Sequence, residues 1–199
     1  MNALKRAQIA SRCRPILFNT EMVQAILEGR KTVTRRVIDR ERIDRVLSSP
    51  CRKNLPDVTD KHMIEKLLLP RYEPGDILYV RETWQQVPTD PAFREPFYIY
   101  KADGKWNATW RPSIHMPKEA ARIFLRVTGV SVERLQDITA LGCIAEGIHY
   151  DPSVAVGEEF VVGMFSYLWD STIRPVERKV YGWEANPWVW RYEFERVVI

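Results

Sequence analysis

The octet Gly29-Arg30-Lys31-Thr32-Val33-Thr34-Arg35-Arg36 joins a predicted helix to a predicted strand. The helix precedes it as an apolar segment at residues 22–27, for which Asn19 or Thr20 is a suitable N-cap. Gly29 can take the left-handed conformation that commonly ends a helix. Several β-branched residues follow, which favours a strand. The sequence therefore predicts that four cationic side chains and two hydroxyl groups gather at one helix-to-strand junction.

Lys31 is the residue of this octet on which chemistry would depend. Like charges close together disfavour protonation, so we expect the surrounding arginines to lower the pKa of Lys31, and more so if it is buried. A neutral lysine can act as a general base or a nucleophile. Thr34, three residues further on, is near enough to be the hydroxyl that it activates. The alternative is a basic, solvated strand end, and composition and spacing do not exclude it.

Residues 27–36 resemble the signature of ASCH domains, which share the PUA-like β-barrel and are associated with RNA binding. One branch of that family consists of small bacterial amidohydrolases that remove the acetyl group from acetylcytidine. Their motif reads Gly-Arg-Lys-Thr-x-Thr-x-Arg. This chain matches every fixed position of that motif, at Gly29, Arg30, Lys31, Thr32, Thr34 and Arg36.

Glu146 extends this resemblance. In the small amidohydrolases a catalytic glutamate lies seven residues after the threonine of a Leu-Thr or Ile-Thr pair, and Ile138-Thr139 keeps that spacing. The resemblance implies a catalytic trio with Lys31 as base, Thr34 as nucleophile and Glu146 as proton donor to the leaving amine. Arg36 would stabilise the oxyanion. Nearby arginines would oppose this by stabilising the ionised glutamate.

Other segments extend the resemblance from about Pro15 to the end of the chain. Glu73-Pro74-Gly75-Asp76 predicts a β-turn before an apolar strand, which is an ASCH and PUA-like feature. Residues 110–117 and 186–190 resemble a longer ASCH-like group found in phage and prophage genomes. Together with the octet, these regions supply the candidate ligand-binding residues Arg30, Arg35, Arg36, Arg81, Glu82, Trp84, Ser113 and His115.

Several of these candidates have an equally good structural interpretation. Trp84 could stack on a nucleobase or lie in the core. Ser113 and His115 could orient a ligand or pack over the end of the barrel. Arg81 and Glu82 could line a pocket or pair with other charges.

We expect an α+β fold, a PUA-like mixed β-barrel flanked by helices, over residues 15–199, after a flexible basic arm at 1–14. Compared with the small amidohydrolases, insertions are expected at about 39–70 and 85–118. The clearest strand covers 186–197, where aromatic residues alternate with others. That aromatic stripe predicts barrel core, and a base-stacking platform is the alternative.

The composition sets limits on function. The 199 residues are 45% hydrophobic, which suffices for one packed domain. A net charge of +4 permits an anionic partner without requiring one. The three cysteines and three histidines are widely spaced, which predicts reduced thiols and no metal site. No segment has the length of a membrane span or the pattern of a signal peptide, so a cytoplasmic location is expected.

The sequence therefore favours a nucleoside- or RNA-interacting protein. Deacylation of a modified nucleobase such as acetylcytidine is the specific hypothesis, and it needs no metal or cofactor. The alternatives are a non-catalytic RNA- or nucleotide-binding module, a nuclease, or an adaptor that acts through protein contacts.

Overall fold

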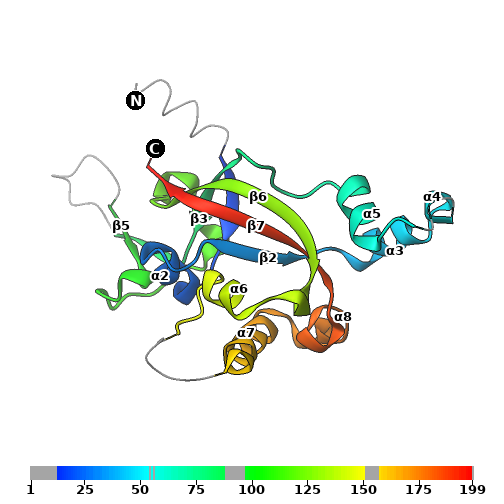
Figure 1. Ribbon diagram of the computed structural model, residues 1–199. Helices are drawn as coiled ribbons and strands as arrows, with labels where there is room; N and C mark the ends of the chain where they lie inside the picture. Colours follow the sequence, from blue (N-terminus) through cyan, green and yellow to red (C-terminus); the bar gives the residue numbers. More distant parts are fainter. Residues whose placement is uncertain (1–12, 54, 56, 88–96, 151–156, 199) are drawn as a thin grey trace.

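The computed structural model describes residues 13–53, 55, 57–87, 97–150 and 157–198 (Figure 1). Residues 1–12 of the expected basic arm lie outside this range. The longer helices are α2 (Thr20–Leu27), α3 (Arg40–Leu47), α4 (Pro50–Lys53), α5 (Asp60–Leu67), α6 (Ala140–Ala145), α7 (Glu158–Thr172) and α8 (Arg178–Tyr181). The strands are β1 (Arg14–Leu17), β2 (Val33–Val37), β3 (Ile77–Arg81), β4 (Trp84–Val87), β5 (Phe97–Tyr100), β6 (Phe124–Arg134) and β7 (Trp188–Val197). The expected α+β class is confirmed.

Five of the strands form one mixed sheet in the order β1-β3-β6-β7-β2. β1 pairs in parallel with β3, and the other neighbours are antiparallel. The long strands β6 and β7 pair from Phe124 with Val197 to Arg134 with Trp188, with a bulge between Val127 and Gly129. β4 and β5 form a separate two-stranded sheet. In Figure 1, β6 curves across the molecule beside the straighter β7.

The five-stranded sheet is not closed into a barrel, so the expected closure is wrong. β1 and β2 are its two edges, and no backbone pairing joins them in the described part of the chain. A side chain bridges the gap instead: Arg36 Nη2 on β2 donates a hydrogen bond of 2.9 Å to the Leu17 carbonyl oxygen on β1. The Arg36 Cζ atom also lies 5.3 Å from the centroid of the Phe18 ring. The Arg36 side chain therefore links the two edge strands.

The core has a separate cluster on each face of the sheet. On one face lie the alternating aromatic residues Trp190, Tyr192 and Phe194 of β7, which are buried as the period of two predicts. Val189 points to the other face, where α6 and α7 pack through residues such as Cys143 and Phe165. Figure 1 shows α7 and α8 together beside the sheet.

The stretch at 39–70, expected as an insertion, forms helices α3, α4 and α5. Ile43, Val46, Met63 and Ile64 from these helices are buried in the same cluster as the β7 aromatics. This segment is thus part of the main core. Part of the second expected insertion, residues 88–96, lies outside the described residues. Among the helices that are described, none is both long and apolar enough to cross a membrane.

Candidate functional site

The helix-to-strand junction forms as the sequence predicts. Asn19 caps α2 by accepting a hydrogen bond of 2.8 Å from the backbone N–H of Met22. Gly29 follows the end of the helix with a φ of 78°, a conformation that glycine adopts without the steric cost of a Cβ. The backbone N–H groups of Arg30 and Lys31 then both donate to the Ala25 carbonyl, at 2.9 and 3.0 Å. This tight turn directs Lys31 into the protein before β2 begins.

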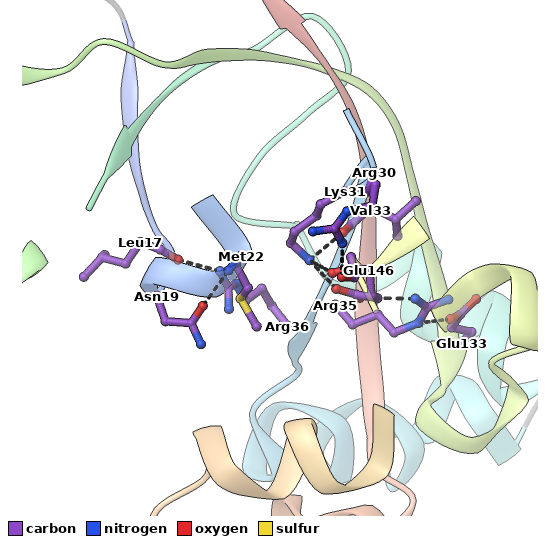
Figure 2. Close-up of polar contacts among 11 residues, drawn as sticks. Leu17, Asn19, Met22, Arg30, Lys31, Val33, Arg35, Arg36, Glu133 and Glu146 are labelled. Atoms are coloured by element: carbon purple, nitrogen blue, oxygen red, sulfur yellow. Dashed lines mark hydrogen bonds and ion pairs between the residues drawn. The ribbon is translucent and has the colours of Figure 1, made fainter. Parts of the chain in front are cut away.

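The side chain of Lys31 is fully enclosed and contacts Glu146 (Figure 2). Its Nζ atom lies 2.6 Å from Glu146 Oε2, 2.8 Å from the Glu146 carbonyl oxygen and 2.9 Å from the Val33 carbonyl oxygen. Glu146 follows α6, whose N-cap Thr139 accepts from the Gly142 N–H at 3.1 Å. Three acceptors match the three N–H donors of an ammonium group. This geometry suits a charged Lys31.

Arg35 completes a buried ion cluster, which we define as Lys31, Arg35, Glu133 and Glu146. Arg35 Nε donates to Glu133 Oε1 at 2.6 Å, and its Nη1 donates to Glu146 Oε1 at 3.1 Å (Figure 2). The Glu146 carboxylate therefore accepts from two cations. Buried charges of this kind are tolerated because each is paired and hydrogen-bonded.

Burial is the main cause that lowers the pKa of Lys31, and the Glu146 carboxylate opposes it. Arg36 and Arg35 lower this pKa further, by less than burial does. The octet's charges predicted the arginines as the first cause of the shift, so the order of the causes differs from that expectation. Burial also lowers the pKa of Arg36, again with Glu146 opposing.

Thr34 is buried on β2, where its register partner is Tyr192 on β7. Successive strand residues point to opposite faces, so Thr34 faces away from Arg35 and shares a face with Arg36. Within the described residues no polar contact joins Thr34 to Lys31 or Glu146. Of the implied trio, the structure thus brings Lys31 and Glu146 into direct contact.

Arg36 lines a cavity of about 600 Å³, which we call the Arg36 cavity. Arg36 is half-buried, and no carboxylate of the described residues lies within ion-pair distance of its guanidinium group. The start of α2, the end of α7 and two loops form the other walls. The lining residues are Leu17, Phe18, Asn19, Thr20, Glu21, Met22, Thr83, Lys101, Pro112, Ser113, Ser171 and Thr172. Of the predicted ligand-binding residues, Arg36 and Ser113 are brought together here.

Two other predicted ligand-binding residues, Arg30 and Arg81, are engaged in structural contacts. Arg30 Nε bonds Glu28 at 2.7 Å and its Nη1 donates to the Gly147 carbonyl at 2.7 Å. Arg81 donates to the carbonyl oxygens of Met116, at 2.9 Å, and Ile114. His115 lies in the same loop with an exposed side chain.

Glu82 and Trp84 are buried, at 1% and 3% exposure. Glu82 forms a two-point ion pair with Arg122, with Nε–Oε1 and Nη2–Oε2 distances of 2.9 and 3.0 Å. The Trp84 ring contacts both the Tyr98 ring and the Arg111 guanidinium group. Their positions correspond to the structural alternatives, a paired carboxylate and a core tryptophan.

Sequence reasoning missed Glu133 and Lys101. Glu133 lies near the end of β6, where polar and apolar residues are about equally frequent, so the sequence carries no signal of its ion pair. Lys101 follows β5 and also has no such signal. Within the described ranges, no group of three His, Cys, Asp or Glu side chains is placed to hold a metal ion.

A scan against protein-family models and a search of curated proteins each gave no match. A search of solved structures found a protein of Enterococcus faecalis V583 described by the family model DUF984, at 11% identity and a TM-score of 0.40. The match covers 87% of this chain but 65% of that one, so the chain spans less than two thirds of its length. The search also found an ASCH domain of Lactobacillus crispatus JV V101, at 15% identity, 97% and 91% coverage, and a TM-score of 0.39.

The Lactobacillus structure is of the domain class that the octet resembles. At TM-scores near 0.4 neither likeness carries an argument about the site.

Proposed function

We propose that this protein binds a nucleotide or the backbone of an RNA in the Arg36 cavity. One observation carries the proposal: a half-buried guanidinium group faces a cavity of about 600 Å³, and no carboxylate of the described residues lies within ion-pair distance of it. The Leu17 carbonyl and the Phe18 ring hold this group in place. A fixed, unpaired arginine favours phosphate, because its planar donors match phosphate oxygens.

The surroundings of Arg36 support an anionic ligand. The first turn of α2 faces the cavity, and a helix N-terminus carries a partial positive charge. Lys101 adds a cation, while Glu21 is the one acidic residue among the described residues of the lining. Thr83 and Ser113 offer hydroxyl groups for a sugar or a base. The volume falls within the range of roughly 300–1,000 Å³ that is usual for small-ligand sites. The octet's resemblance to RNA-associated ASCH domains points the same way.

Fluorescence anisotropy with a short labelled single-stranded RNA tests this proposal. We expect affinity to fall steeply between 50 and 200 mM salt, on the order of tenfold for each two or three phosphates contacted. Unlabelled nucleoside monophosphate should compete for the same site. Failure to bind both RNA and nucleoside monophosphate at low salt would contradict the proposal.

We propose amidohydrolysis of an acylated nucleobase amine as the second candidate function. The supporting observation is the 2.6 Å separation between Lys31 Nζ and Glu146 Oε2. Transfer of one proton along this hydrogen bond gives a neutral amine and a protonated carboxyl group. Those are the states that a base at Lys31 and an acid at Glu146 require. Burial favours the neutral pair, whereas Arg35 favours the ionised one.

This reaction requires the Thr34 hydroxyl to come within hydrogen-bond distance of Lys31 Nζ, whose present partners are Val33 and Glu146. Lys31 then takes the hydroxyl proton as the Thr34 oxygen bonds the acyl carbon. The C–N bond then breaks, and the amine leaves with the proton of Glu146. Water hydrolyses the resulting ester and restores Thr34. Release of acetate from acetylcytidine, abolished in Lys31→Ala, Thr34→Ala and Glu146→Ala, would support this candidate. A folded wild-type protein that releases no acetate from acetylcytidine would rule out that substrate.

A further inference from the structure

Two exposed aromatic side chains contact each other on the surface of the small β4–β5 sheet. The ring centroids of Phe97 and Trp106 lie 6.4 Å apart, and the two residues are 55% and 49% exposed. Phe97 begins β5, whereas Trp106 belongs to the loop that follows this strand. Single exposed apolar residues are ordinary, but two aromatic rings in mutual contact form a surface on which a planar partner can pack.

Strand β5 connects this aromatic pair to the Arg36 cavity. The strand ends at Tyr100, and the next residue, Lys101, lines the cavity. Because a strand rises about 3.3 Å per residue, Phe97 lies roughly 13 Å from Lys101 along the chain. Lys101 opens the short 3-10 helix η1 (Lys101–Asp103), which is attached to α2 because Gln24 Nε2 donates to the Ala102 carbonyl at 3.0 Å. Figure 1 shows β5 close to α2, so regular structure sets the distance between the aromatic pair and the cavity.

The charges of this segment favour an anionic partner. Lys101 and Lys105 are exposed, and among the residues that the structure describes no carboxylate lies within ion-pair distance of either. Asp103, the one acidic residue between Phe97 and Trp106, already pairs with Arg122 at 2.7 Å. Lysine is depleted at protein–protein interfaces, whereas aromatic rings beside cations are the combination that binds single-stranded nucleic acid.

We propose that the Phe97–Trp106 pair stacks a base of a single-stranded RNA whose backbone enters the Arg36 cavity. This inference rests on the proposed function and deepens it, since it names a single strand of several nucleotides as the ligand in place of a free nucleotide. Lys101 lies between the two contacts and binds a phosphate of the strand. Every base has a π-face, so stacking gives affinity with little sequence preference. A duplex hides these faces within its own stack and should bind less well.

Fluorescence anisotropy with a labelled oligoadenylate of about six nucleotides tests this proposal, with unlabelled adenosine monophosphate as the competitor. At the same salt concentration we expect the oligonucleotide to bind about tenfold or more tightly than the monophosphate. Trp106→Leu keeps an apolar side chain but loses the aromatic ring. It should weaken oligonucleotide binding about tenfold and leave monophosphate binding unchanged. Annealing the oligoadenylate to oligouridylate should remove the effect of this substitution.

Phe160→Leu is the matched control, because Phe160 is an exposed aromatic residue of α7 that does not line the cavity. It should bind both ligands as the wild type does, whereas Arg36→Gln should weaken both. Lys105→Gln is a second variant, which serves also if Trp106→Leu does not fold. It should lower the slope of log affinity against log salt by about one for the oligonucleotide, and leave that slope unchanged for the monophosphate.

The outcomes separate this inference from the proposed function. Monophosphate binding that depends on Arg36, together with equal oligonucleotide affinity in Trp106→Leu and Phe160→Leu, would overturn the inference and leave the proposed function standing. A wild type that binds neither ligand would remove both. Self-association in analytical ultracentrifugation that Trp106→Leu abolishes, without loss of oligonucleotide affinity, would assign the aromatic pair to a protein contact and also overturn the inference.

Discussion

Lys31 Nζ and Glu146 Oε2 lie 2.6 Å apart although 115 residues separate the two in sequence. The contact attaches the end of α6 to the turn before β2. Two further hydrogen bonds join the same segments. The Thr32 N–H donates to the Ala145 carbonyl at 2.9 Å, and Arg30 Nη1 donates to the Gly147 carbonyl at 2.7 Å. The residues with candidate catalytic roles thus also hold two distant segments together, and measurements of stability separate these roles from activity.

Loss of the Glu146 charge should destabilise the protein strongly. Glu146→Gln leaves both Lys31 and Arg35 without this carboxylate in a buried site, and such uncompensated charges typically cost about 3–5 kcal/mol. Lys31→Met should cost less, because Glu146 keeps its pairing with Arg35. Urea unfolding measures both free energies.

The control for this prediction is Asp44→Asn. Asp44 pairs with Arg40 at 2.9 Å on the surface, where both side chains are more than half exposed. An exposed pair contributes about 0–1 kcal/mol. A free energy of unfolding for Glu146→Gln that equals that of Asp44→Asn would show that the buried ion cluster contributes little to stability.

Gly147→Ala should be more harmful than Gly29→Ala. Both glycines have a positive φ, 99° and 78°, so each substitution meets a backbone cost of roughly 1–2 kcal/mol. At Gly147 the new Cβ would also lie 2.9 Å from the Ala25 Cβ and 3.2 Å from the Lys31 Cβ. At Gly29 it would meet nothing within 4 Å. Thermal unfolding should therefore rank Gly147→Ala as the less stable, and an equal loss in both would contradict the packing described around Lys31.

Cys143 should resist ionisation in the folded protein. Burial raises the pKa of its thiol from 9.0 to about 11. Below pH 9 the thiol is neutral in both the folded and the unfolded chain, and its contribution to stability is fully present. As the pH rises from 9 towards 11, the unfolded chain ionises first, so stability is lost. The free energy of unfolding should fall less over this range in Cys143→Ala than in the wild type, and equal slopes would contradict the shift.

The junction was predictable from sequence because its signals are local. Asn19, Gly29 and the β-branched run specify a helix, its end and a strand within about twenty residues. The approach of Glu146 to Lys31 was implied by a family motif with fixed spacing. No local pattern contains that information.

The structural features that could not be predicted from the sequence depend on contacts between distant segments. The contact between the two edges of the open sheet is one such feature, because the Arg36 side chain on β2 bonds the Leu17 carbonyl on β1. The pairing of Glu82 with Arg122 needs the link between β3 and β4 to meet the segment just before β6. Side chains such as these are equally compatible with a ligand site until their distant partners are known.

The central claim, that Arg36 presents a fixed cation to a phosphate-bearing ligand, is tested most directly by calorimetric titration of a nucleoside monophosphate at low salt. Arg36→Gln removes the charge from the cavity, and Arg126→Gln removes an exposed one that is paired with Glu195 at 3.0 Å on the strand β6. We predict affinity about tenfold or more weaker in Arg36→Gln, since a charged hydrogen bond contributes about 1.5–3 kcal/mol, and unchanged affinity in Arg126→Gln. Equal affinity of the wild type and a folded Arg36→Gln would contradict the claim.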